Sequence, residues 1–323
     1  MVKLFNKLSQ LRLNTCIFYV LWLLAIVFFF TYYGQFNYDH IAKEELTKKL
    51  YYKINPKVKF KDQTPECDYE QLLKSTKTVQ VWEALEQDDI FSANGVVNGT
   101  FMPDCMPLFS VAILVTYRNR QKQLDTFLPY MHNFLRKQNI HYRIYLIEQQ
   151  DEKPWNKGLL YNIGARQAIA DRFPCLILHD VDLLPLDAGN LYACAQQPRH
   201  MSASIDKFRY VLPYAWLVGG VLAVRADQYT MLNGFSNRFR GWGGEDDDFS
   251  RRITDHKLDI LRFPRQQSRY TMIRHRQEPK NEQRERIMAE NRAAPDSEGF
   301  NSLRYEELQV RPGRLAVHLL VKL

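Results

Sequence analysis

The chain has 323 residues, of which 46% are hydrophobic and 25% are charged. This ordinary globular composition excludes wholesale disorder, a collagen-like repeat and a low-complexity chain. The 44 Lys and Arg exceed the 36 Asp and Glu, and a net charge of +8 is a first hint of a nucleic-acid partner. However, residues 1–66 hold ten Lys and Arg against five acids and contribute +5, which leaves +3 for the rest of the chain. The folded part is nearly neutral, so we expect no nucleic-acid partner.

A charge-free run of eighteen residues extends from Cys16 to Tyr33. At 1.5 Å per residue it forms about 27 Å of helix, enough for a thin bilayer. A cleaved signal peptide is the alternative, but its apolar core is usually shorter and ends in small residues, whereas this run ends in two tyrosines. Three basic residues precede the run, and the positive-inside rule keeps them cytoplasmic. We predict a cytoplasmic tail over 1–13, a signal-anchor in the lipid bilayer over 14–33, and a luminal remainder.

The first luminal stretch, 34–66, is rich in Lys, contains two prolines and shows no regular apolar period. This pattern predicts a solvated stem before a catalytic domain over 67–323. Four cysteines lie beyond the predicted anchor, so an oxidising compartment favours two disulfides, although three pairings are open. Asn98-Gly99-Thr100 is a glycosylation sequon that only a luminal chain can use.

From residue 107 onward, short apolar runs alternate with helix-period segments. Apolar runs at 111–115, 142–147 and 175–178 predict buried strands, and the segments at 124–135 and 157–170 predict helices. Strands that alternate with helices in this way predict a parallel sheet with right-handed crossovers. Ligands of such sheets bind beyond the carboxyl ends of the strands, which directs attention to residues 116–120 and 179–182.

One acidic pair directly follows the third predicted strand, in Asp180-Val181-Asp182. Two acids one residue apart can hold a hard divalent cation and, through it, a diphosphate. A solvated turn is the common alternative for an acidic strand end.

A run of glycines and acids extends from Gly241 to Asp248 and includes Trp242. Four consecutive acids repel one another inside a helix, but the macrodipole stabilises them at a helix N-terminus. An acid-rich capping turn is the alternative, yet the glycines let the backbone and the Trp242 ring approach a ligand. A carboxylate crowded by others has a raised pKa and can serve as a general base.

A methionine and a histidine lie three residues apart in Met272-Ile273-Arg274-His275, at the end of a β-rich stretch. A core methionine and a hydrogen-bonding histidine are the usual explanation. A thioether and an imidazole together nevertheless suit a transition metal better than magnesium.

Taken together, in this order and spacing, the motifs are specific. From about Cys67 to its C-terminus the chain resembles the β1,4-galactosyltransferase family, Golgi enzymes with the GT-A nucleotide-sugar-binding fold. The resemblance implies an α/β domain with a Rossmann-like mixed sheet flanked by helices. The matching blocks are Tyr117-Arg118-Asn119-Arg120, Asn156 to Gly164, Cys175 to Pro185, Gln197 to His200, Asp206 to Phe208, Leu212 to Tyr214, Asn233 to Phe235, the glycine-acid run, Met272 to His275 and Gly299 to Leu303.

The resemblance also implies a role for individual residues. Asp182, Met272 and His275 would ligate Mn²⁺. Asp246 would be the catalytic base, with Glu245 beside it. Trp242 would lie in a mobile loop that closes over the donor. The implied disulfides are Cys67–Cys105 and Cys175–Cys194. The donor nucleotide would be held by Thr116, Tyr117, Arg118, Asn119, Arg120, Trp155, Asn156, Lys157, Asp180 and Val181, with Lys207 near the diphosphate, and the acceptor sugar by Tyr214, Gly244, Glu245, Asp246, Asp247 and Arg284.

The activity implied is an inverting, Mn²⁺-dependent transfer from a UDP-sugar in β1,4 linkage to terminal β-GlcNAc, by a single-pass type II protein of the Golgi membrane. One departure concerns the donor, because Leu217 stands where galactose-transferring members have Tyr, beside the C2 substituent of the sugar. The smaller side chain leaves room for an N-acetyl group, so we expect UDP-GalNAc, with UDP-Gal as the alternative. One such contact is worth about 1–3 kcal/mol, roughly 10- to 200-fold. Neutral drift compensated at Trp216 or Val218 is the other interpretation.

A second departure concerns the acceptor. Residues 283–288 form a shorter segment than in the family and lack its aromatic residue, although Arg284 and Ile287 can still reach the acceptor. A non-catalytic glycan-binding or escort protein is a competing hypothesis, but every expected base and metal position is filled. A metal-dependent hydrolase is the third. The class of the natural acceptor, a homo-oligomeric state and a helper protein stay open.

Overall fold

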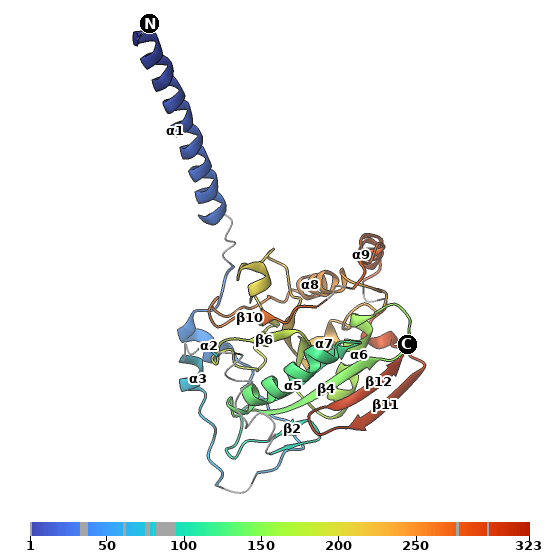
Figure 1. The fold of residues 1–323 in the computed structure, drawn as a ribbon. Helices are drawn as coiled ribbons and strands as arrows, with labels where there is room; N and C mark the ends of the chain where they lie inside the picture. The colour runs from blue at the N-terminus through green and yellow to red at the C-terminus, as the bar shows by residue number, and fades with distance from the viewer. Residues whose placement is uncertain are drawn as a thin grey trace.

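The computed structural model describes residues 2–32, 38–60, 63–74, 78–79, 81, 95–275, 278–295 and 297–323. Figure 1 shows a sheet with helices packed around it, and helix α1 apart from them. The helices are α1 (Val2–Tyr32), η1 (Lys43–Glu45), α2 (Leu46–Lys49), α3 (Glu70–Lys74), α5 (Gln121–Arg136), α6 (Lys157–Ala170), η3 (Asp206–Phe208), α7 (Ala226–Met231), α8 (Glu245–Asp255), α9 (Arg284–Ala293) and η4 (Phe300–Ser302).

The strands form one large mixed sheet and one small sheet. In the large sheet β3 pairs in parallel with both β4 and β5, β12 extends the parallel part beside β4, and β9 runs antiparallel to β5. The parallel β3, β4 and β5 and their connecting helices confirm the predicted alternation. The strands of the large sheet are β1 (Val96–Val97), β2 (Thr100–Phe101), β3 (Ser110–Tyr117), β4 (His141–Gln149), β5 (Cys175–Asp180), β7 (Arg199–His200), β9 (Val221–Arg225), β11 (Glu307–Pro312) and β12 (Val317–Lys322).

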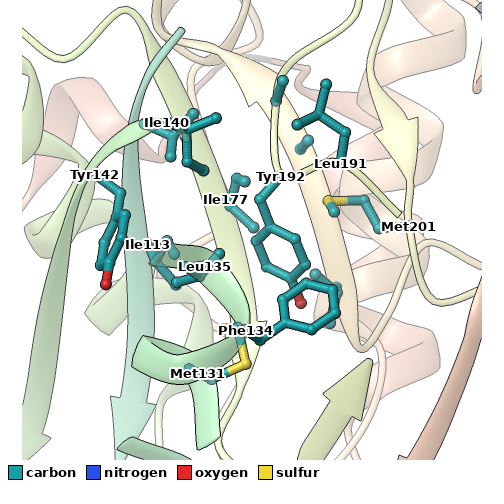
Figure 2. Packing of buried hydrophobic residues seen from close by; sticks show 14 of the residues in the cluster. Ile113, Met131, Phe134, Leu135, Ile140, Tyr142, Ile177, Leu191, Tyr192 and Met201 are labelled. Carbon is teal, nitrogen blue, oxygen red and sulfur yellow. The ribbon is translucent and has the colours of Figure 1, made fainter. Parts of the chain in front are cut away.

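Helices cover both faces of the large sheet, and strand β3 is therefore buried on both sides. Its odd residues, such as Ile113, belong to the same cluster as α5, while its even residues, such as Leu114, belong to the cluster of α6 and α8. Figure 2 shows Met131, Phe134 and Leu135 of α5 on the first face, near Ile113 and Tyr192. The alternation of a strand thus separates two cores, and the sheet is the middle layer.

The small sheet brings a late segment of the chain next to β5. Strand β10 (Arg269–Met272) pairs with β6 (Leu183–Pro185) and with β8 (Ser204–Ile205). Met272 lies opposite Leu183, and the amide of Ile273 donates to the carbonyl of Asp182 at 2.7 Å. The predicted strand end at Met272 is confirmed, and it lies beside the acidic strand end of β5.

The described part of the predicted stem, 38–60, packs against the domain rather than forming a solvated spacer. Leu46 and Leu50 are buried, and Ile41 belongs to the same core cluster as α5. Backbone hydrogen bonds reinforce the contact, for example from Tyr51 to the carbonyl of Cys194 at 2.9 Å. Apolar residues spaced irregularly along a Lys-rich segment gave no periodic pattern, which is why the sequence predicted a spacer. The domain boundaries themselves stay predictions.

Both disulfides that the resemblance implied are present, Cys67–Cys105 and Cys175–Cys194. Asn98 lies exposed in the turn between β1 and β2, and its glycosylation stays a prediction.

Residues 14–32 of the predicted anchor lie in helix α1. Across the described residues, no helix is both long and apolar enough to cross a membrane. Tyr33, the last residue of the predicted anchor, lies outside those residues. The anchor and the luminal orientation stay predictions.

Candidate active site

The candidate site lies where β3 and β5 end, at the sheet edge that the strand order predicted. Thr116 and Asp180 are neighbours in register at these ends. Helix α6 begins at the same edge with Lys157, and Asn156 caps it by accepting the amide of Leu159 at 3.0 Å. The first turn of α6 therefore points Lys157 toward the acids that follow β5.

Lys157 gathers three carboxylates from two segments that lie far apart in the sequence. Its Nζ atom lies 2.9 Å from Asp180 Oδ1, 3.6 Å from Asp246 Oδ2 and 3.8 Å from Glu245 Oε1. Coulombic attraction to these acids raises the pKa of Lys157 well above its usual value, although burial opposes the shift. A permanent cation thus lies among the acids predicted to bind donor and acceptor.

Helix α8 presents the acid run at its first turn, as predicted. Gly244 precedes the helix with φ of +102°, a left-handed conformation that favours glycine. A Cβ atom at this position would lie 2.6 Å from Phe239 Cε1, so a side chain would not fit. Glu245, Asp246 and Asp247 then follow at the positive end of the helix dipole, where negative charge is stabilised.

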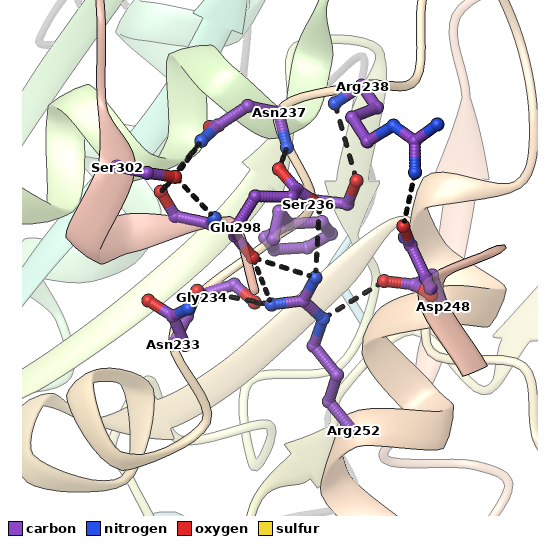
Figure 3. Close-up of polar contacts among 12 residues, drawn as sticks. Asn233, Gly234, Ser236, Asn237, Arg238, Asp248, Arg252, Glu298 and Ser302 are labelled. Carbon is purple, nitrogen blue, oxygen red and sulfur yellow. Dashed lines mark hydrogen bonds and ion pairs between the residues drawn. The ribbon is translucent and has the colours of Figure 1, made fainter. Parts of the chain in front are cut away.

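A buried arginine fixes α8 in place (Figure 3). Arg252 Nε donates to Asp248 Oδ2 at 3.0 Å, and its Nη1 donates to the carbonyls of Asn233 and Gly234 at 3.3 Å and of Glu298 at 3.2 Å. Asp248 is completely buried in these contacts. The fourth acid of the run is therefore structural, and the network ties the first three to the loops behind them.

Burial dominates the electrostatics of the two acids of α8 that lie beside Lys157. It raises the pKa of Asp246 to about 7, with Lys157 lowering the value and Glu245 and Asp180 raising it. The pKa of Glu245 is raised for the same chief reason. Glu245 Oε2 is buried and has no hydrogen-bond partner within the part of the chain that the structure describes. A ligand hydroxyl would satisfy it, because buried polar atoms are normally paired.

The segment 211–219 forms the wall opposite α8. The Tyr214 hydroxyl donates to Asp247 Oδ1 at 3.0 Å. Gly219 faces Asp246 so closely that a Cβ atom there would lie 2.5 Å from Asp246 Oδ2 and 3.6 Å from Leu217 Cδ1. Leu217, predicted to meet the donor sugar, is thus next to the predicted base.

Two arginines after β3 share one acid. Arg118 Nη2 and Arg120 Nη2 lie 3.6 Å and 3.7 Å from the two carboxylate oxygens of Glu278. The Arg118 guanidinium also lies 5.4 Å from the centre of the Trp155 ring. A carboxylate held between two guanidinium groups marks a place that suits a phosphate group.

The backbone of Gly241 and Trp242 is hydrogen-bonded to residues that neighbour Arg118 and Glu278. The amide of Gly241 donates to the carbonyl of Trp155 at 2.7 Å, and the amide of Trp242 donates to the carbonyl of Pro279 at 2.8 Å. The Trp242 side chain is 44% exposed, so it is available to a ligand. Arg284, the first residue of α9, lies against Gly243 and Gly244.

The predicted metal ligands come from the two strand ends described above. Asp182 is buried, and its Oδ2 atom lies 2.5 Å from His275 Nε2. Met272 is partly buried on the strand that leads to His275, and its amide donates to Asp206 Oδ1 at 3.0 Å. No group of three His, Cys, Asp or Glu side chains suited to a metal occurs among the described residues. A carboxylate, an imidazole and a thioether are donors that suit a transition metal, and the metal site stays a prediction.

Several predicted nucleotide-binding residues have structural partners instead of open side chains. The Asn156 amide donates to the carbonyl of Asn237 at 2.8 Å, and the Tyr117 hydroxyl donates to Gln121 Oε1 at 2.9 Å. Val181 is buried, whereas Lys207 is exposed and its Nζ atom lies 5.7 Å from the centre of the Phe208 ring. Asn119 has φ of +52° in the turn after β3. Their roles stay predictions.

Sequence reasoning assigned no role to three residues that belong to this site: Tyr161, Gly219 and Glu278. The Tyr161 hydroxyl donates to Asp180 Oδ1 at 3.2 Å, and its place four residues after Lys157 on one helix face could have indicated it. Gly219 and Glu278 contact residues that are distant in the sequence, and a local sequence pattern cannot predict such contacts.

Two family models match the chain. The model described as the N-terminal region of glycosyl transferase group 7 matches residues 67–195, and the one described as the N-terminal domain of galactosyltransferase matches residues 199–276. The chain is 40% identical over 213 residues to β-1,4-galactosyltransferase 2 of Cricetulus griseus, and 40% identical over 223 residues to β-1,4-galactosyltransferase 1 of Homo sapiens. The chain belongs to the β1,4-galactosyltransferase family.

These matches cover 64% and 68% of the chain, but only 58% and 56% of the two relatives' own lengths. A solved family structure, the catalytic domain of Drosophila β1,4-galactosyltransferase 7 with xylobiose, matches with a TM-score of 0.57 at 28% identity. A mutant of that enzyme with manganese, UDP-Gal and xylobiose matches with a TM-score of 0.56 at 27% identity. Each covers 66% of this chain and 93% of the solved chain. The mixed α/β fold is thus of the family's GT-A type.

Proposed function

We propose that the protein is an inverting glycosyltransferase that moves a galactose-type sugar from a UDP-linked donor to a hydroxyl group of an acceptor glycan. The observation that carries this proposal is the pair of the partly buried Asp246 and the buried Glu245 beside Lys157, at the sheet edge where Arg118 and Arg120 also lie. It puts a proton acceptor and phosphate-binding cations on one side of a fold whose relatives are named galactosyltransferases. A glycan-binding protein without activity needs no carboxylate with its pKa raised to about 7.

The reaction is a single displacement. Asp246 accepts the proton of the acceptor hydroxyl, and the freed oxygen attacks the anomeric carbon of the donor. The bond from that carbon to the UDP oxygen breaks, and UDP leaves with the electron pair. Arg118 and Arg120 stabilise the charge that develops on the leaving diphosphate. Attack opposite the leaving group inverts the configuration, so an α-linked donor gives a β-linked product.

Neighbouring residues orient the acceptor and the base. Tyr214 holds Asp247 through its hydroxyl, and the unpartnered Glu245 oxygen is placed to accept a second hydroxyl of the acceptor sugar. The bare Gly219 backbone leaves Asp246 open on its other side. Closure of the Trp242 segment over the donor would exclude water and limit hydrolysis of the donor.

Asp182, Met272 and His275 would hold Mn²⁺, in keeping with the manganese in the related complex. When bound, the ion would supply positive charge next to the donor diphosphate.

UDP-Gal is the proposed donor, because the relatives are galactosyltransferases and the related complex contains UDP-Gal. UDP-GalNAc is a second candidate, which the branched Leu217 next to Asp246 favours. The proposed acceptor is terminal β-GlcNAc of a glycoprotein or glycolipid. The proposed location is the Golgi membrane, with residues 14–33 as anchor and the catalytic domain in the lumen.

The test offers the purified full-length chain UDP-Gal and UDP-GalNAc with a β-GlcNAc acceptor and Mn²⁺. A β1,4-linked product that disappears with EDTA and returns with Mn²⁺ is expected. Release of free sugar without a disaccharide product would indicate a hydrolase, and binding of the acceptor without product would indicate the non-catalytic alternative.

A further inference from the structure

Residues 38–41 pack against segment 211–219 and the chain around Arg262, although they precede the part of the chain that the family models match. We call residues 38–41 the strap. Tyr38 and Ile41 are each only 8% exposed. The Tyr38 hydroxyl donates to the carbonyl of Phe263 at 3.2 Å, and the amide of Ile41 donates to the carbonyl of Arg262 at 3.0 Å. The strap is therefore bound to the segment around Arg262.

Arg262 in turn binds segment 211–219, the wall of the site. Its Nη2 atom donates to the carbonyls of Ala215 at 2.7 Å and Leu217 at 3.0 Å. Its guanidinium lies 5.7 Å from the centre of the Tyr38 ring and is 6% exposed. The Tyr38 ring thus covers a cation whose hydrogen bonds fix two carbonyls of segment 211–219.

A buried histidine extends the same support to Gly219. Arg262 Nε donates to His200 Nδ1 at 3.3 Å, and His200 Nε2 donates to the carbonyl of Gly219 at 3.0 Å. Burial lowers the pKa of His200 to about 3, so the ring is neutral and carries one proton, on Nε2. Both contacts are satisfied by this tautomer. The backbone carbonyls of residues 215, 217 and 219 in the wall are therefore each hydrogen-bonded by Arg262 or His200.

The strap also packs directly on the wall. Tyr38, Ala203 and Leu212 form a small apolar cluster, and the Leu217 side chain packs against it. On its other side this wall holds Asp247 through Tyr214 and abuts Asp246 through Gly219. Segment 211–219 thus connects the strap to Asp246 and Asp247 in the first turn of α8.

We propose that the strap is a positioning element for the sugar site, and that Tyr38 sets the place of Leu217 and Gly219 relative to Asp246. This inference rests on the proposed function and deepens it, because it gives part of the predicted stem a role in donor choice. Loss of the Tyr38 ring would admit water to Arg262 and weaken its hydrogen bonds to the wall, since such bonds are stronger when shielded. It would also leave the Leu217 side chain free to shift.

The test compares Tyr38→Ala with Leu50→Ala in the full chain. Leu50 is a matched control, because it is also a buried stem residue (2% exposed) but contacts the domain at Ala195. We expect Tyr38→Ala to change the ratio of kcat/KM for UDP-Gal and UDP-GalNAc about tenfold, with Leu50→Ala leaving the ratio unchanged. Tyr38→Phe keeps the ring and should stay within about twofold of the unaltered protein. Tyr38→Leu, which removes the ring but keeps an apolar side chain, is the variant to use if Tyr38→Ala fails to fold.

Amide hydrogen exchange over residues 214–219 gives a readout that does not depend on activity. Faster exchange there in Tyr38→Ala than in Leu50→Ala, at equal temperatures below unfolding, supports the positioning role even if no sugar transfer is detected. Equal exchange and an equal donor ratio in the two variants would show that the strap only adds stability. If the unaltered chain transfers no sugar while exchange still responds to Tyr38, the proposed function fails and the strap's support of the wall stands.

Discussion

Lys157 and Asp246 lie 3.6 Å apart, between Nζ and Oδ2, although Lys157 is the first residue of α6 and Asp246 is the second residue of α8. Two helix N-termini therefore face each other across the site, and each presents its first-turn side chain. Desolvation raises the pKa of the partly buried Asp246 carboxyl to about 7, and the ammonium beside it opposes a larger rise. A base with this pKa is half-ionised near neutral pH, where a proton acceptor is most effective.

Replacing Asp246 with Asn should reduce kcat by about 10²- to 10⁴-fold, because the amide cannot accept the acceptor's proton. Binding of UDP should persist, since Arg118, Arg120 and Lys157 are unchanged. Asp255→Asn is the matched control, as Asp255 ends the same helix and pairs with Arg251 at 2.8 Å. Initial rates and UDP titration by calorimetry provide the measurement. Full activity in Asp246→Asn would overturn the assignment of the base.

The pH dependence of kcat follows from the raised pKa of Asp246. Below about pH 7 the carboxyl is protonated and cannot accept a proton, so kcat should fall about tenfold per pH unit, and it should level off above that value. Lys157 lowers this pKa, so Lys157→Met should move the acid limb of the profile to higher pH. Lys153→Met, which removes a half-exposed lysine paired with Glu306, should leave the limb in place. A limb that stayed fixed in Lys157→Met would contradict the coupling.

Glu278 occupies the space between Arg118 and Arg120, so it competes with the donor's phosphates for the two guanidinium groups. Glu278→Gln should lower the KM for the UDP-sugar, by at most about fivefold, because partly exposed ion pairs are worth roughly 1 kcal/mol or less. The effect should shrink at high salt, where exposed charges are screened. Glu282→Gln removes an exposed acid from the same segment and serves as control. An unchanged KM at low salt would show that the donor displaces Glu278 from the two arginines with no measurable loss of binding free energy.

The sequence predicted those parts of the fold that depend on local periodicity. Helix α6 was expected over 157–170 and runs from Lys157 to Ala170, and the three apolar runs became the parallel strands β3, β4 and β5. The acid run begins a helix because four like charges are stable only at its positive end. Each of these predictions depends only on residues that are close together in the sequence.

Contacts between distant segments were beyond that reasoning. Tyr38 and Phe263 are 225 positions apart, and no pattern in the Lys-rich stretch marks Tyr38 as buried. The pairing of Glu278 with Arg118 likewise depends on how the chain returns after β10. Asn156 was predicted as a nucleotide ligand from a family motif, and in the structure its side chain caps α6. A motif identifies a place in the fold more reliably than the atom that a side chain offers.

The space next to Leu217 is the proposed determinant of donor choice. The Cδ1 atom of Leu217 lies 3.6 Å from the position that a Cβ atom on Gly219 would occupy, and that position lies 2.5 Å from Asp246 Oδ2. Leu217→Tyr adds a ring and a hydroxyl at this place. The added bulk should disfavour the N-acetyl group of UDP-GalNAc and so raise the preference for UDP-Gal by about 10- to 200-fold. Trp216→Tyr is the control, because Trp216 is the adjacent residue but is 59% exposed. Both donors compete in one reaction with a β-GlcNAc acceptor, and the two products are counted by mass spectrometry. An equal product ratio in the Leu217→Tyr variant and the unaltered chain would mean that Leu217 does not contact the sugar's C2 substituent.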